Sequence, residues 1–146
     1  MSLLAFATAA TLGATPVHAP VHRVDMDHRG STYQVDYRAH VETRMRSIGM
    51  SAPTRPSNRR CLITADVSVE RVIVAGQGGH ALKSMLPQDQ SFTSSLPGGC
   101  QGREAEAARL VQNKAGAIDA HLASAAASDS HAALAAIESA HHFAAN

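Results

Sequence analysis

The sequence lacks most of the residues and motifs that mark catalytic sites. It has 146 residues, no tryptophan, two tyrosines and three phenylalanines, so a core must be built largely from aliphatic side chains and many alanines. No G-x-S-x-G element is present to position a serine nucleophile. The sequence also has no H-E-x-x-H metalloprotease motif. We therefore predict no catalytic residues and no cofactor.

A strong excess of charge of either sign is also missing. The formal net charge is +1, whereas dedicated nucleic-acid binders carry a much larger basic excess. The balance is slightly uneven, because residues 20–74 sum to +3 and residues 75–146 sum to −2. We predict no nucleic-acid partner.

The first nineteen residues contain no charged side chain. An apolar stretch from Leu3 to Ala14 is followed by Val17-His18-Ala19, which resembles the small-residue site of a secretory signal peptide. The stretch is too short to span a bilayer. We expect residues 1–19 to be a signal peptide and residues 20–146 to form one periplasmic or secreted domain, with a sheet region over 20–99 and a helical region over 100–146.

The chain has only two cysteines, Cys61 and Cys100. They are too few for a structural zinc site and too far apart for a redox C-x-x-C pair. In an exported chain an even cysteine count indicates a disulfide. We predict a Cys61–Cys100 bond that pins the start of the helical region to a strand.

Period-2 alternation is the clearest pattern in the first half. Odd positions from Tyr33 to Met45 are mostly apolar and the even positions between them are polar, which is typical of a strand with one buried face. The same alternation recurs from Cys61 to Val69 and continues to Val74. Weaker strands are expected over 21–27 and 80–86, with a strand or loop over 88–99. Such two-faced strands belong to an antiparallel sheet.

The period changes to that of a helix after residue 101, where apolar residues fall on one stripe and seventeen alanines occur between 105 and 145. Ser128, Asp129 and Ser130 are good N-cap residues for a second helix, although one continuous helix remains an alternative. The prediction is an α+β fold, with an antiparallel sheet of three to five strands packed on one face by one or two Ala-rich C-terminal helices. The strand residues expected to face Leu110, Val111, Ile118 and Leu122 are Tyr33, Val35, Tyr37, Val41, Ile63, Val67 and Val69.

The glycine-rich stretch after Val74 matches the letters of a dinucleotide-binding fingerprint at Gly76, Gly78 and Ala81. That fingerprint requires a crossover helix after the glycines, but only six residues separate His80 from Pro87. We interpret 75–79 as a hairpin turn and predict no nucleotide ligand.

Eight histidines follow residue 19, and neutral imidazole is a good ligand for zinc or copper. No pair among these eight has the H-x-x-x-H spacing that places two rings on one helical face. His121, His141 and His142 are the best of the weak metal-ligand candidates. Each of these histidines is better interpreted as a core or surface residue.

Arginines gather on the polar face of the long strand and in the loop before Cys61. Their guanidinium groups can bind phosphate or carboxylate with two hydrogen bonds. The candidates for a weak anion-binding patch are Arg38, Arg44, Arg46, Arg55, Arg59 and Arg60. The alternative is an ordinary solvated face that Asp36, Glu42 and Asp66 partly neutralise.

Two functional hypotheses follow. The preferred one is a small exported, non-enzymatic interaction or structural protein whose Arg-rich sheet face contacts an anionic envelope lipid or an acidic protein. The alternative is a small histidine-dependent metal-binding protein or hydrolase.

Overall fold

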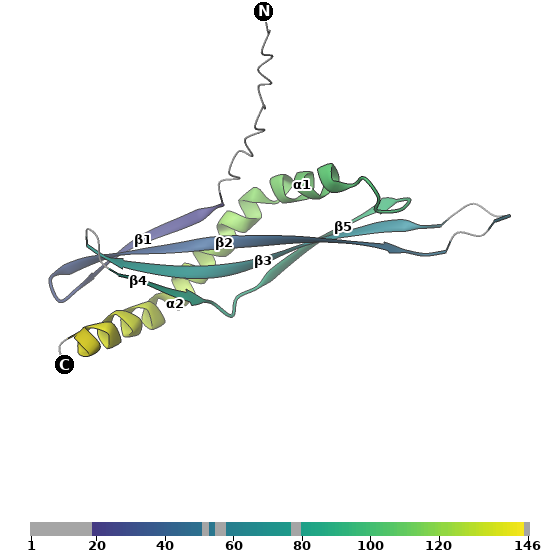
Figure 1. Ribbon diagram of the computed structural model, residues 1–146. Helices are drawn as coiled ribbons and strands as arrows, with labels where there is room; N and C mark the ends of the chain where they lie inside the picture. Colours follow the sequence, from purple (N-terminus) through teal and green to yellow (C-terminus); the bar gives the residue numbers. More distant parts are fainter. Residues whose placement is uncertain (1–18, 51–52, 55–57, 77–79, 145–146) are drawn as a thin grey trace, which may run out of the picture.

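A five-stranded antiparallel sheet forms one layer of the protein and two C-terminal helices form the other (Figure 1). The computed structural model describes residues 19–50, 53–54, 58–76 and 80–144. This architecture confirms the predicted α+β class. The proposed signal peptide lies outside the described residues apart from Ala19. Within the described part of the chain, no helix is both long enough and apolar enough to cross a membrane.

The two long central strands, β2 and β3, organise the sheet. They pair along almost their whole length, while β1 extends one edge of the sheet and the other edge is shared by β4 and β5. The end of the sheet near Tyr33 therefore has the strand order β1-β2-β3-β4. The end near Cys61 has the order β2-β3-β5. The bounds are β1 (Val21–His28), β2 (Ser31–Ile48), β3 (Arg60–Ala75), β4 (Ala81–Met85) and β5 (Gln90–Pro97).

The turn between β1 and β2 consists of Arg29 and Gly30, where a turn was predicted. Both residues have positive φ, 51° and 78°, as the tightest hairpin loops require. The predicted hairpin after Val74 is also confirmed in outline, because β3 and β4 pair as antiparallel neighbours. Gly78 lies outside the described residues.

The break between the two helices lies at a different position from the one predicted from the sequence. α1 (Glu104–Asn113) and α2 (Ala115–Ala144) are separated at Lys114, not near Ser128. Gly116, a poor helix former, lies just beyond the break. The hydroxyls of Ser128 and Ser130 donate to carbonyls of the preceding helical turn instead of capping a new helix.

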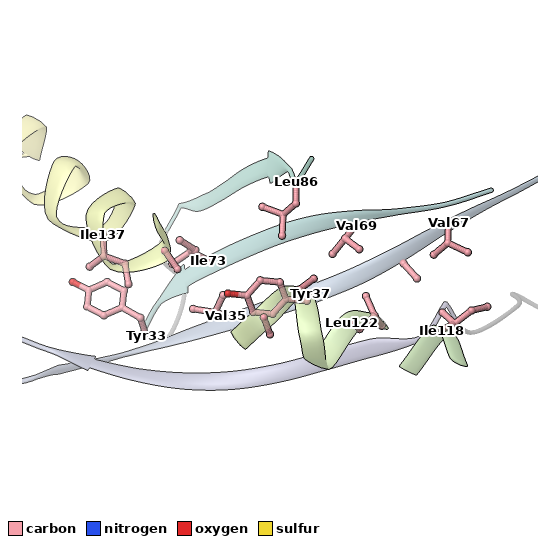
Figure 2. Close-up of a cluster of buried hydrophobic side chains, with 14 residues drawn as sticks. Tyr33, Val35, Tyr37, Val67, Val69, Ile73, Leu86, Ile118, Leu122 and Ile137 are labelled. Atoms are coloured by element: carbon pink, nitrogen blue, oxygen red, sulfur yellow. The ribbon is translucent and has the colours of Figure 1, made fainter. Parts of the chain in front are cut away.

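The core lies between the helices and the face of the sheet that carries the odd-numbered residues of β2 and β3, which we call the odd-numbered face. Tyr33, Ile73 and Ile137 gather at one end of the main cluster, and Val67 and Ile118 lie toward the other end (Figure 2). In a second cluster, Ala107 and Leu110 of α1 pack against the N-terminal end of β3. The expected packing between these strand and helix residues is therefore confirmed. The cluster members with essentially no exposed area are Val35, Tyr37, Val69, Cys61, Ala65 and Ala133.

The predicted disulfide between Cys61 and Cys100 is present. Cys61 belongs to β3, and Cys100 lies just before α1. The Cys100 amide also donates to the Ser47 hydroxyl at 3.0 Å, so the start of the helical region is fixed to both long strands.

Removing this bond by replacing both cysteines with serine is expected to destabilise the fold by about 4 kcal/mol, because the unfolded chain loses a loop constraint. Urea denaturation of the oxidised wild type and the variant measures the difference. The wild type in dithiothreitol should behave like the variant. Equal midpoints for oxidised and reduced wild type would contradict the expectation.

Candidate functional site

The opposite face of the sheet carries the even-numbered residues of β2 and β3, and we call it the even-numbered face. No described helix covers it, and most of the predicted arginines lie on it. Arg38, Arg44 and Arg46 share this face of β2, and the register places Arg60 on the same face of β3 opposite Ile48. Arg55 lies outside the described residues. Arg59 lies next to Arg60, but the alternation turns it toward the helical side, where its guanidinium lies near Gly99.

The arginine nearest the middle of the sheet is largely neutralised. Arg38 donates to Asp36 at 3.2 Å, and Arg23 donates to the same carboxylate at 2.7 Å. The hydrogen bond from Arg23 is the main reason why the pKa of Asp36 lies below its usual value. In this part of the face two arginines share one carboxylate in an ion-pair cluster.

The arginines near the end of the sheet are less compensated. Arg44 contacts Asp66, and the Ser91 hydroxyl also donates to that carboxylate. The hydrogen bond from Ser91, followed by that from Arg44, lowers the pKa of Asp66. Arg46 makes no hydrogen bond or ion pair with any other described residue. Arg60 donates to the neutral Ser95 hydroxyl at 2.9 Å.

We call residues 43–48 of β2 and 60–65 of β3 the distal arm. This segment contains three arginines and no acidic residue. In Figure 1 the β2–β3 ribbon continues past α1 toward the loop that joins the two strands. A hollow of about 410 Å³ on the arm is lined by Arg44, Met45, Arg46, Leu62 and Thr64.

Apolar side chains are also exposed at the end of the arm. Met45 and Ile48 are 36% and 37% exposed, and Met50 just beyond them is 81% exposed. Gly49 starts the connecting loop with φ of +87°, and a Cβ there would lie 2.7 Å from the Asn58 carbonyl oxygen. The Met50 amide donates to the Asn58 side chain at 3.1 Å. Exposed Ile48 and Met50 thus lie at the same end of the arm as Arg46 and Arg60.

The three histidines proposed as metal ligands lie on one helix but not together. His121 is twenty residues from His141, which is about 30 Å along a helix. His141 hydrogen-bonds with the Tyr33 hydroxyl, while His142 lies 3.6 Å from Glu138. No group of three or more potential ligands is arranged to hold a metal ion among the described residues.

Glu138 instead joins the β1–β2 turn to α2. His28, the last residue of β1, and Arg29 of the turn both contact its carboxylate. The hydrogen bond with His28 is the largest cause of the lowered pKa of Glu138. This contact links the β1–β2 hairpin to the C-terminal half of α2.

A buried polar cluster, absent from the predicted sites, joins the sheet to the middle of α2. Arg71 donates to both carboxylate oxygens of Asp129, at 2.9 and 2.8 Å, and the Tyr37 hydroxyl donates to the same carboxylate at 3.1 Å. All three residues are buried. The sequence did hold a signal, because Arg71 interrupts the apolar positions of β3 and Asp129 interrupts the apolar stripe of α2.

Comparisons of the chain with protein-family models, curated proteins and solved structures found no match.

Replacing Asp129 with alanine is expected to destabilise the fold by about 3–5 kcal/mol, because it leaves the Arg71 guanidinium buried without a counter-charge. The double variant Arg71→Met with Asp129→Leu should recover most of that loss, since neither buried charge remains. Chemical denaturation measures both. Equal losses for the single and double variants would show that the pair is not the source of the effect.

Tyr37 should make stability depend on pH in alkaline solution. Burial, and then the Asp129 charge, raises its pKa to about 12. The unfolded chain releases this proton near pH 10. Stability should therefore be fully present below pH 10 and should fall as pH rises toward 12. Denaturation midpoints across this range should fall less steeply for Tyr37→Phe, and parallel curves for the two proteins would refute this assignment.

Proposed function

We propose that this protein is a small exported, non-enzymatic interaction protein that contacts an anionic lipid surface through the distal arm. The observation that carries the proposal is the combination of Arg44, Arg46 and Arg60 with exposed Ile48 on the same face and exposed Met50 just beyond it. Basic residues attract anionic head groups, and exposed apolar side chains gain by entering the interface below them.

Charge and exposure favour a lipid surface over an acidic protein as the partner. Arg46 has no ion-pair partner among the described residues, and Arg60 is bonded only to a neutral hydroxyl, so both are available to phosphate groups. The side chains of an acidic protein would pair with the arginines. They would bury less of Met50, which is four-fifths exposed, than the apolar region of a membrane would. Each arginine near an anionic surface contributes about 1 kcal/mol to binding.

The disulfide supports the exported location. Disulfides persist in oxidising compartments, such as the periplasm and the extracellular space, and are rare in the cytosol. Together with the uncharged, apolar N-terminal segment, the Cys61–Cys100 bond is what we expect of an envelope or secreted protein.

Reversing the charge of Arg44 and Arg46 to glutamate is expected to weaken binding to phosphatidylglycerol vesicles by at least about 30-fold, because two attractive charges become repulsive. Vesicle flotation measures the bound fraction. Wild-type binding should decrease with added salt and should be absent with phosphatidylcholine vesicles.

A matched control carries Arg109→Glu and Lys114→Glu, which change the net charge equally on the helical side of the sheet. This variant should bind nearly as well as wild type. If both variants lost vesicle binding equally, net charge and not the distal arm would explain the result. Binding to soluble polyglutamate but not to vesicles would replace the lipid surface with an acidic protein partner.

A further inference from the structure

A second surface lies at the opposite end of the sheet, in the groove between β4 and the C-terminal half of α2. Two adjoining hollows occupy this groove, with volumes of about 520 and 300 Å³, and Leu82 and Ala140 line both of them. The larger hollow falls within the range of about 300–1,000 Å³ that is typical of small-molecule sites. The side chains that line it are Tyr33, Ile73, Ala75, His80, Leu82, Ile137, Ala140 and His141.

The groove stays open because small side chains face each other across it. Ala136, Ser139 and Ala140 of α2 line it on the helix side, and Ala75 lines it at the end of β3. All five residues of β4 remain exposed, and Leu82 is 41% exposed although the register points it to the helical side. Figure 2 shows Tyr33, Ile73 and Ile137 together at this end of the core. The larger hollow is therefore an apolar channel that no side chain of the described residues fills.

The smaller hollow adds two cationic side chains to one end of the channel, and one of them, Arg71, is already paired with Asp129. This hollow is lined by Arg71 and Lys83, together with Ser84 and Ser139. The register directs the Cβ of Lys83 to the face opposite Leu82, so its long side chain reaches the hollow around the edge of β4. Among the described residues, no aspartate or glutamate lines either hollow. Arg71 is nine-tenths buried and uses Nη1 to bind Asp129, but its buried Nε has no hydrogen-bond partner among the described residues. A buried N–H without an acceptor is unfavourable, and a ligand oxygen would satisfy it.

We propose that this groove binds an anionic single-chain amphiphile, namely a long-chain carboxylate. Its hydrocarbon chain would lie in the larger hollow between Ile73, Leu82 and Ile137. Its carboxylate would lie in the smaller hollow and accept hydrogen bonds from Lys83 and Arg71. The site is independent of the distal arm, because about 13 strand residues, or roughly 45 Å, separate Tyr33 from Arg46.

Isothermal titration calorimetry with dodecanoate, below the concentration at which it forms micelles, tests the proposal. Wild type should bind one equivalent. Ala140→Trp should fill the channel and weaken binding at least tenfold, whereas Ala135→Trp, on an exposed position of the same helix, should bind within twofold of wild type. Equal binding by the two tryptophan variants, or no binding by wild type, would overturn the proposal.

The head-group assignment has its own test in an exposed side chain that the fold does not require. Lys83→Gln should weaken dodecanoate binding about tenfold and leave dodecanol binding unchanged. Dodecyltrimethylammonium should bind wild type more weakly than dodecanoate does. If the cationic amphiphile binds as tightly as the anionic one, the groove does not select an anion. The Arg44→Glu, Arg46→Glu variant should retain dodecanoate binding, which separates this site from the proposed function.

Discussion

The buried contact between Arg71 of β3 and Asp129 of α2 is the interaction on which the arrangement of the two layers depends. An alanine-rich helix presents a shallow surface, and shallow surfaces define the position of a helix on a sheet only weakly. A buried ion pair is specific in position, because any shift of the helix would leave two charges without partners. The Tyr37 hydroxyl adds a third member from the neighbouring strand. One polar cluster therefore sets the register of a 30-residue helix against both central strands.

The position of α2 determines which surfaces remain free. The helix covers the odd-numbered face near Tyr33 and Tyr37, and α1 covers the same face near Cys61, where the disulfide holds the start of the helical region. No described helix covers the opposite face of β2 and β3, and the arginines of the distal arm lie on that face. At the other end, α2 and β4 diverge enough to leave the groove. Both proposed binding surfaces are thus consequences of one docking geometry.

Much of the fold could be predicted because the strand pattern is local. Alternation from Tyr33 to Met45 and from Cys61 to Val74 defines which side chains are buried without reference to the rest of the chain. The break between the helices was less predictable, because Ser128 and Ser130 can cap a helix or bond to its preceding turn, and only packing decides between them. Asp129 is a favourable capping residue by type. Its actual partner, Arg71, lies 58 positions away, so the local sequence gives no indication of the pair. The groove depends on small residues in three distant segments, so no single stretch of sequence indicates it.

Amide hydrogen exchange of the oxidised protein, followed by mass spectrometry, tests the docking geometry most directly. Slowly exchanging amides should extend through β3 from Val67 to Ile73 and through the part of α2 on either side of Asp129. Their opening free energies should be similar, because the strand and the helix open together when the ion pair breaks. Rapid exchange in the middle of α2, with the strands still protected, would contradict this account.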